Sequence, residues 1–207
     1  MSLVKLKFKL VPGGISILYF VIPIFLLLCF QSAQALISRA VSQSNPSFRV
    51  EQIAQGLGIP WGMAFLNQSE LIFTERKGKV KILNLDNLKI TSLQGAAEVV
   101  AAGQGGMLDV ATSPDYTSQG WIYFTYSKAT DSGAVTTLAR AKRDGYKLTK
   151  WQDLLISASA TNTGRHFGSR IAFDGKGHVY FGIGDRGERD NAQNLSNHAG
   201  TIMRLRF

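Results

Sequence analysis

The sequence contains few residues that form cross-links or bind metals. It has one cysteine, Cys29, and three histidines among 207 residues. A single cysteine excludes an internal disulfide, so the stability of the fold must come from packing. His178 and His198 have no second histidine at the spacing of a zinc site, and both are predicted to be structural.

Long amphipathic periodicity is also missing. From Phe48 onward no stretch keeps a helical repeat of apolar residues over three turns. Short apolar runs instead alternate with Gly, Asp, Asn and Pro, the residues that punctuate strands. This pattern predicts an all-β domain over residues 48–207.

The longest apolar run lies near the N-terminus. Residues 15–30 are almost entirely apolar, follow three lysines, and lead to Ala33-Gln34-Ala35. A basic start, an apolar centre and small residues at alternate positions are typical of a secretory signal peptide. We predict that residues 1–35 are a cleaved signal, that residues 36–47 form a flexible leader, and that the protein is periplasmic or secreted. An uncleaved membrane anchor is the alternative.

The charge balance is basic but does not indicate a nucleic-acid partner. The formal net charge is +9, and removal of three lysines with the signal leaves +6. The basic residues are scattered along the chain, and export separates the protein from most nucleic acid. The charge therefore indicates solubility or attraction to an anionic surface.

Three segments repeat the same order of elements: a short strand, a polar turn and a more apolar strand. Their aligned residues Ala64, Ala111 and Ala172 are 47 and 61 positions apart. Such repeats favour the blades of a β-propeller. A β-sandwich gives similar apolar runs, so spacing alone leaves it open.

Short motifs follow one another at residues 60–65, 74–76, 103–111, 113–116, 166–170, 184–187 and 200–205. In order and spacing they resemble the glucose/sorbosone dehydrogenases, which include soluble quinoprotein glucose dehydrogenases and periplasmic aldose sugar dehydrogenases. The resemblance implies a six-bladed β-propeller that binds pyrroloquinoline quinone (PQQ) and its substrate at the top of the central channel. It covers the N-terminal half of that fold, about three blades, and truncation of a longer coding sequence is the expected reason.

The same resemblance implies oxidation of aldose sugars to lactones by hydride transfer to PQQ, with an external electron acceptor. His166 matches the family's general base, and a neutral imidazole suits that role. Gln104 matches the glutamine that hydrogen-bonds the sugar, since its amide both donates and accepts. Arg165 replaces an acidic substrate-binding residue of the soluble glucose enzymes, so a broader range of aldoses is expected.

Several alternatives remain open at this point. The family's main PQQ segments, and the calcium ligands of the soluble glucose enzymes, are not found in this sequence, so no cofactor-binding residue or metal ligand is assigned. A non-catalytic sugar-binding half-propeller and a calcium-dependent lactonase are the other candidate functions. Residues 184–191 do not match an EF-hand and are predicted to be a solvated loop with internal Arg–carboxylate pairs. Residues 74–76 either line a channel or form an ordinary strand end.

Overall fold

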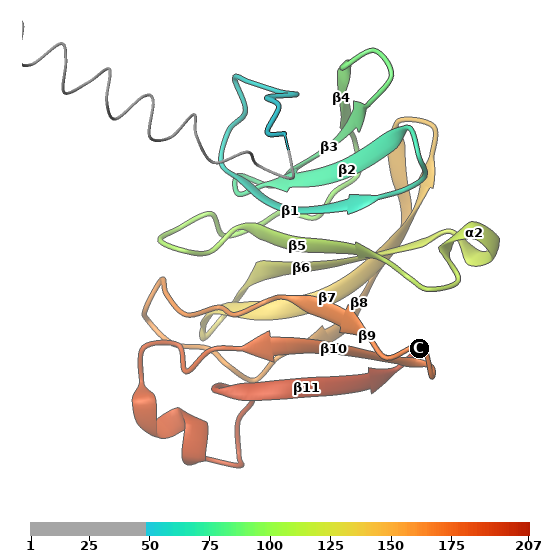
Figure 1. Cartoon of the computed structure of the whole chain (residues 1–207). Coiled ribbons are helices and arrows are strands. Elements are labelled where there is room, and N and C mark those ends of the chain that lie inside the picture. Colours follow the sequence, from blue (N-terminus) through green and yellow to red (C-terminus); the bar gives the residue numbers. More distant parts are fainter. Residues whose placement is uncertain (1–48) are drawn as a thin grey trace, which may run out of the picture. The chain divides into compact units, whose positions relative to one another are not determined.

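The computed structural model describes residues 49–207 (Figure 1). The predicted signal peptide and leader lie outside the described residues. Residues 52–207 form one compact unit. Within the described range, no helix has the length and apolar character that crossing a membrane requires.

Three antiparallel sheets follow one another along the chain, and each connects strands that are neighbours in sequence. The first contains β1 (Pro60–Phe65), β2 (Glu70–Glu75), β3 (Lys79–Asn84) and β4 (Ile90–Leu93). The second contains β5 (Met107–Thr112), β6 (Trp121–Thr130), β7 (Gly133–Asp144) and β8 (Lys147–Ile156). The third contains β9 (Ile171–Phe173), β10 (His178–Ile183) and β11 (Thr201–Arg206).

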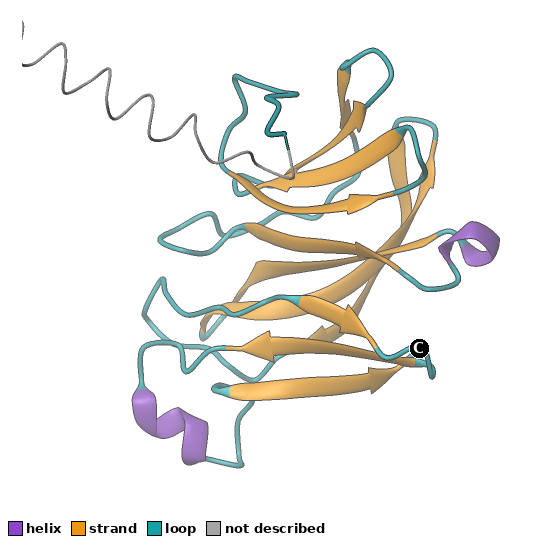
Figure 2. Ribbon diagram, viewed as in Figure 1, coloured by secondary structure: helices purple, strands orange, loops and turns teal. Residues whose placement is uncertain are grey.

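The sheets lie one above another, and helices are confined to loops (Figure 2). The short helix α2 (Tyr116–Gln119) precedes β6, and the 3-10 helix η1 (Arg189–Gln193) lies between β10 and β11. Successive antiparallel meanders of this kind are the blades of a β-propeller. The predicted all-β propeller fold with about three blades is therefore confirmed, and the sandwich alternative is wrong.

The repeats predicted from the sequence are the first two strands of each sheet. Ala64 pairs with Ile72, and Ala111 and Ala172 pair with residues at the matching positions of β6 and β10. The pairing register shifts within both β1 and β5, between Pro60 and Met63 and between Met107 and Val110. The three aligned alanines therefore occupy equivalent places in three blades.

The hydrophobic core fills both spaces between the sheets. Alternate residues of a strand point to opposite faces, so β6 contributes to two clusters. Ile122 and Phe124 pack with residues of the first sheet such as Ile72, while Tyr123 packs with residues of the third sheet such as Phe181. The middle sheet is therefore buried on both faces, which fixes the three blades relative to each other.

Threonine hydroxyls bridge the sheets at one repeated position. Thr74 Oγ1 accepts a hydrogen bond from the Gly62 N–H at 3.0 Å and donates to the Leu108 carbonyl at 2.5 Å. Thr125 Oγ1 accepts from the Asp109 N–H at 3.1 Å and donates to the Ser169 carbonyl at 3.0 Å. Both threonines are fully buried. Each hydroxyl satisfies a backbone donor left free by a register shift and ties its sheet to the next.

The segment 74–76 is a structural strand end. Thr74 bridges two sheets, and Glu75 is buried and paired with Lys81 Nζ at 2.7 Å. Burial opposes ionisation of Glu75, but hydrogen bonds from Lys81 and the Gly58 N–H outweigh it and lower its pKa. Arg76 donates from its guanidinium to the carbonyl oxygen of Gly103. The segment therefore forms a strand end, the second of the two predicted roles, and its contacts hold the start of the next blade.

Candidate functional site

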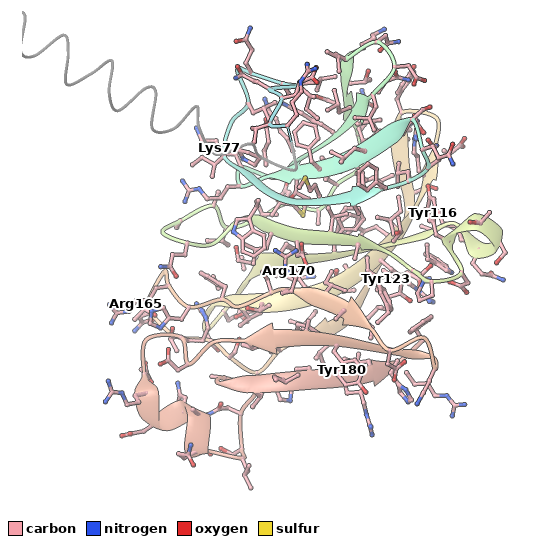
Figure 3. The ribbon with its side chains drawn as sticks, in the orientation of Figure 1. Lys77, Tyr116, Tyr123, Arg165, Arg170 and Tyr180 are labelled. Atoms are coloured by element: carbon pink, nitrogen blue, oxygen red, sulfur yellow. The ribbon has the colours of Figure 1, made fainter. Side chains whose placement is uncertain are left out.

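Loops at one end of the sheets bring the predicted site residues together. In Figure 3, Lys77 and Arg165 lie at this end, whereas Tyr116 and Tyr180 lie toward the opposite end. Three loops meet here: residues 103–106 before β5, residues 157–170 between β8 and β9, and residues 184–187 after β10. They carry Gln104, Arg165 and His166, the three residues predicted from the sequence.

His166 forms a hydrogen-bonded pair with Asp185. The Nδ1 atom of His166 lies 2.6 Å from Asp185 Oδ1, and the two side chains are 47% and 31% exposed. Asp185 also accepts a hydrogen bond from the Gly187 N–H at 2.8 Å. The hydrogen bond from His166, followed by that from Gly187, lowers the pKa of Asp185.

This pairing determines which nitrogen of His166 is available for chemistry. An ionised carboxylate only accepts hydrogen bonds, so in the neutral ring Nδ1 carries the proton and Nε2 carries the lone pair. Among the described residues Nε2 has no hydrogen-bond partner. A histidine held this way by a carboxylate is prepared to accept a proton at Nε2.

Gln104 holds the backbone on the N-terminal side of His166. Its backbone N–H donates to the Gly164 carbonyl at 2.7 Å, and its side-chain Oε1 accepts from the His166 N–H at 2.7 Å. A side chain at Gly103 would collide with the Gly164 carbonyl, so glycine is required for this approach. Gly103 and Gly164 thus allow two loops of the protein to come into contact.

Arg186 holds the same segment from the third sheet. The side chain is fully buried, and its guanidinium lies 3.6 Å above the Phe167 ring. It donates to the carbonyls of Thr163 at 3.0 Å, Ala134 at 3.2 Å and Arg165 at 3.4 Å. Burial without a carboxylate partner lowers the pKa of Arg186.

The prediction of internal Arg–carboxylate pairs in residues 184–191 is wrong, although Glu188, Arg189 and Asp190 are exposed as a solvated loop requires. Asp185 pairs with His166, and Arg186 is directed inward to backbone carbonyls. Arg186 adopts a positive φ of 58°, which local patterns do not reveal. The motif Gly184-Asp185-Arg186-Gly187 was itself a signal, because a histidine base needs an orienting partner and this motif follows a neighbouring strand.

Two exposed arginines flank His166. Arg165 lies beside Gly187, where an added side chain would meet its guanidinium. Arg170, which is 73% exposed, contacts Asp109 Oδ1 at 3.1 Å, and the almost fully buried Asp109 also accepts from the Ile171 N–H at 2.8 Å. Burial raises the pKa of Asp109 despite these contacts. Figure 3 shows that Arg165 lies at the end that carries the site loops, whereas Arg170 lies nearer the middle of the molecule.

The remaining histidines have structural contacts. His178, the first residue of β10, pairs with Asp174 of the preceding turn at 2.8 Å, and His198 Nδ1 accepts from the Ala158 N–H at 3.0 Å. Across residues 49–207, no group of three or more His, Cys, Asp or Glu side chains is placed to hold a metal ion.

Comparisons with known proteins identify a family that matches the part of the chain carrying these motifs. Residues 57–207 match the model of the glucose/sorbosone dehydrogenase family. The aldose sugar dehydrogenase YliI of Escherichia coli is 32% identical over 173 residues, which cover 82% of this chain and 47% of that protein. The chain spans about half the length of the curated relatives it matches.

Solved structures agree with this assignment. The apo-form of the soluble aldose sugar dehydrogenase from Escherichia coli superposes with a TM-score of 0.73 and 31% identity, covering 76% of this chain and 47% of that one. The PQQ-bound aldose sugar dehydrogenase of Streptomyces coelicolor superposes with a TM-score of 0.68 and 26% identity, over the same shares of the two chains. With the motifs, the sheets and the match over residues 57–207 in agreement, the chain belongs to the glucose/sorbosone dehydrogenase family.

Proposed function

We propose that this chain carries the proton-accepting part of an aldose sugar dehydrogenase, with His166 as the general base. The observation that supports this most directly is the 2.6 Å contact between His166 Nδ1 and Asp185, which leaves the lone pair on Nε2 of a side chain that is 47% exposed. Relatives named as aldose sugar dehydrogenases support the substrate class.

The reaction follows from this geometry. Nε2 of His166 takes the proton of the anomeric hydroxyl, the C1–H bond breaks with its electron pair, and C1–OH becomes the carbonyl of a lactone. Asp185 keeps the ring in the productive tautomer and stabilises the imidazolium that forms. Gln104 and Arg165 bind the hydroxyl oxygens of the sugar, because both present donors beside the base.

The residues present fit PQQ, the group held by the Streptomyces coelicolor relative. When bound, PQQ supplies a two-electron acceptor for the hydride. PQQ bears carboxylates, and the Arg170 side chain is 73% exposed. Arg170 is the residue of this chain that would hold one of those carboxylates, and Arg165 is kept for the sugar. We further propose that the protein is exported and that an external acceptor removes the electrons.

The test uses the purified chain with PQQ, a panel of aldoses and an electron-accepting dye. We expect His166→Asn to reduce kcat/KM by about 100-fold or more, the range of general-base catalysis, and His178→Asn to leave it unchanged. His178 is a suitable control because it also pairs with an aspartate but lies at the start of β10, the opposite end of that strand from Asp185. Equal activity of the His166 variant and the wild type would refute the assignment of the base. Sugar binding by calorimetry without dye reduction would instead support a non-catalytic sugar-binding module.

A further inference from the structure

The amide of Gln104 has its two ends in different surroundings. A backbone N–H only donates, so the atom that faces the His166 N–H at 2.7 Å must be the carbonyl oxygen Oε1. This contact fixes the orientation of the amide. The NH2 group then points away from the backbone, and among the described residues it has no hydrogen-bond partner.

The residue that receives this contact has an unfavourable backbone conformation. His166 has a φ of 55°, a region that residues other than glycine rarely occupy. Such a conformation persists only where surrounding contacts determine it. Three sets of hydrogen bonds hold the backbone around His166. The Gln104 side chain accepts from the His166 N–H, and the Gln104 backbone N–H donates to the Gly164 carbonyl. Arg186 donates to the carbonyls of Thr163 and Arg165.

We propose that Gln104 is a positioning residue for His166, in addition to its role in sugar binding. Oε1 holds the backbone of His166 in the left-handed conformation that brings its ring to Asp185, and the NH2 group alone faces the ligand. Gln104 therefore donates to the sugar through its NH2 group. The ligand must present an oxygen lone pair at this point, either from a ring oxygen or from a hydroxyl.

This inference rests on the proposed function for its ligand, but its positioning half is testable without sugar or PQQ. The matched variants are Gln104→Glu, which keeps an acceptor for the His166 N–H and loses the donors, and Gln104→Met, which keeps the length and loses both. NMR of the chain labelled with 15N measures the amide proton of His166 and its ring nitrogens. We expect the Gln104→Glu variant to retain the downfield chemical shift of the His166 amide proton and the Nδ1–H tautomer of its ring. In the Gln104→Met variant the amide proton should lose its downfield shift, and the ring should populate both tautomers.

Kinetics with PQQ and sugar test the two roles separately. We expect Gln104→Glu to raise KM by about tenfold with kcat nearly unchanged, and Gln104→Met to raise KM similarly and also lower kcat by about tenfold. Identical NMR spectra or identical kcat values for the two variants would overturn the inference while the effect of His166→Asn stands. An inactive wild type would count against the proposed function, and the NMR comparison would still decide the positioning role.

Discussion

Replacing Thr125 with valine tests whether hydroxyl bridges hold the sheets together. Valine has nearly the shape of threonine, so the packing changes little. The change removes the acceptor of the Asp109 N–H and the donor to the Ser169 carbonyl, in a region where Asp109, Thr125 and Ser169 are all almost fully buried. A buried polar group without a partner costs about 1–3 kcal/mol; with about 1–2 kcal/mol for each backbone group, the two together should cost about 2–4 kcal/mol.

A second buried threonine provides the matched control. Thr137 in β7 belongs to the same sheet and is fully buried, but its Oγ1 has no hydrogen-bond partner. Thr137→Val removes an unsatisfied polar atom and leaves no partner behind. The free energy of unfolding of this variant should therefore equal or exceed that of the wild type.

Urea unfolding followed by tryptophan fluorescence measures both variants. With a slope of about 2 kcal/mol per molar urea, the Thr125→Val midpoint should fall by about 1–2 M at an unchanged slope. The Thr137→Val midpoint should stay the same or rise. If both variants lower the midpoint equally, loss of a β-branched hydroxyl in general, rather than loss of a bridge between sheets, explains the effect.

Two further predictions concern a carboxylate and a glycine. Asp153 accepts from Lys128, Tyr126 and Trp151, and although burial opposes its ionisation these hydrogen bonds lower its pKa. The contribution of Asp153 to the free energy of unfolding is therefore present above the unfolded pKa of about 4 and is lost as the pH falls through the folded pKa. Asp153→Asn should unfold at a lower urea concentration than the wild type at pH 7, and this difference should shrink at pH 3. An alanine at Gly184 would collide with the His166 carbonyl, whereas one at Gly182 has open space. Gly184→Ala should lose dye reduction and Gly182→Ala should keep it, with unchanged circular dichroism in both.

Much of the fold was predictable because repetition in the sequence reports repetition in space. The aligned alanines fall in equivalent strands, and the polar turns between the paired runs are the observed hairpins. Thr74 and Thr125 occupy the same repeat position, but their bridging of neighbouring sheets was not predicted, because the repeat does not show which side chains cross between sheets. Gln104, Arg165 and His166 met as expected because the loops that carry them lie at the same end of neighbouring sheets.

Asp185 and Arg186 were not assigned roles from the sequence, for a physical reason. Their side chains point to opposite sides within a loop where Arg186 has a positive φ. Periodicity describes strands and helices, but it does not say which way successive loop residues face. A charged run in a loop is usually solvated. Only the hydrogen bond of Asp185 with His166, and those of Arg186 with backbone carbonyls, show that these two side chains are held by the protein.

The site arises where the third repeat departs from the first two. Gly62, Asp109 and Arg170 occupy the same repeat position, and Asp109 contacts Arg170 and lies against Gly62. In the first two repeats this position lies inside a strand that began two residues earlier, at Pro60 or at Met107. In the third repeat the strand β9 begins one residue after this position, at Ile171.

The residues that lie outside the shortened strand adopt conformations incompatible with pairing. His166, Gly168 and Ser169 have φ values of 55°, 74° and 116°. A regular strand requires negative φ, so this segment cannot extend β9 toward its start. The chain instead turns at His166, and the imidazole ring contacts Asp185, which follows the end of the next strand, β10. Loss of strand pairing in one repeat is therefore what places His166, the proposed base, at the rim of an otherwise regular array of blades.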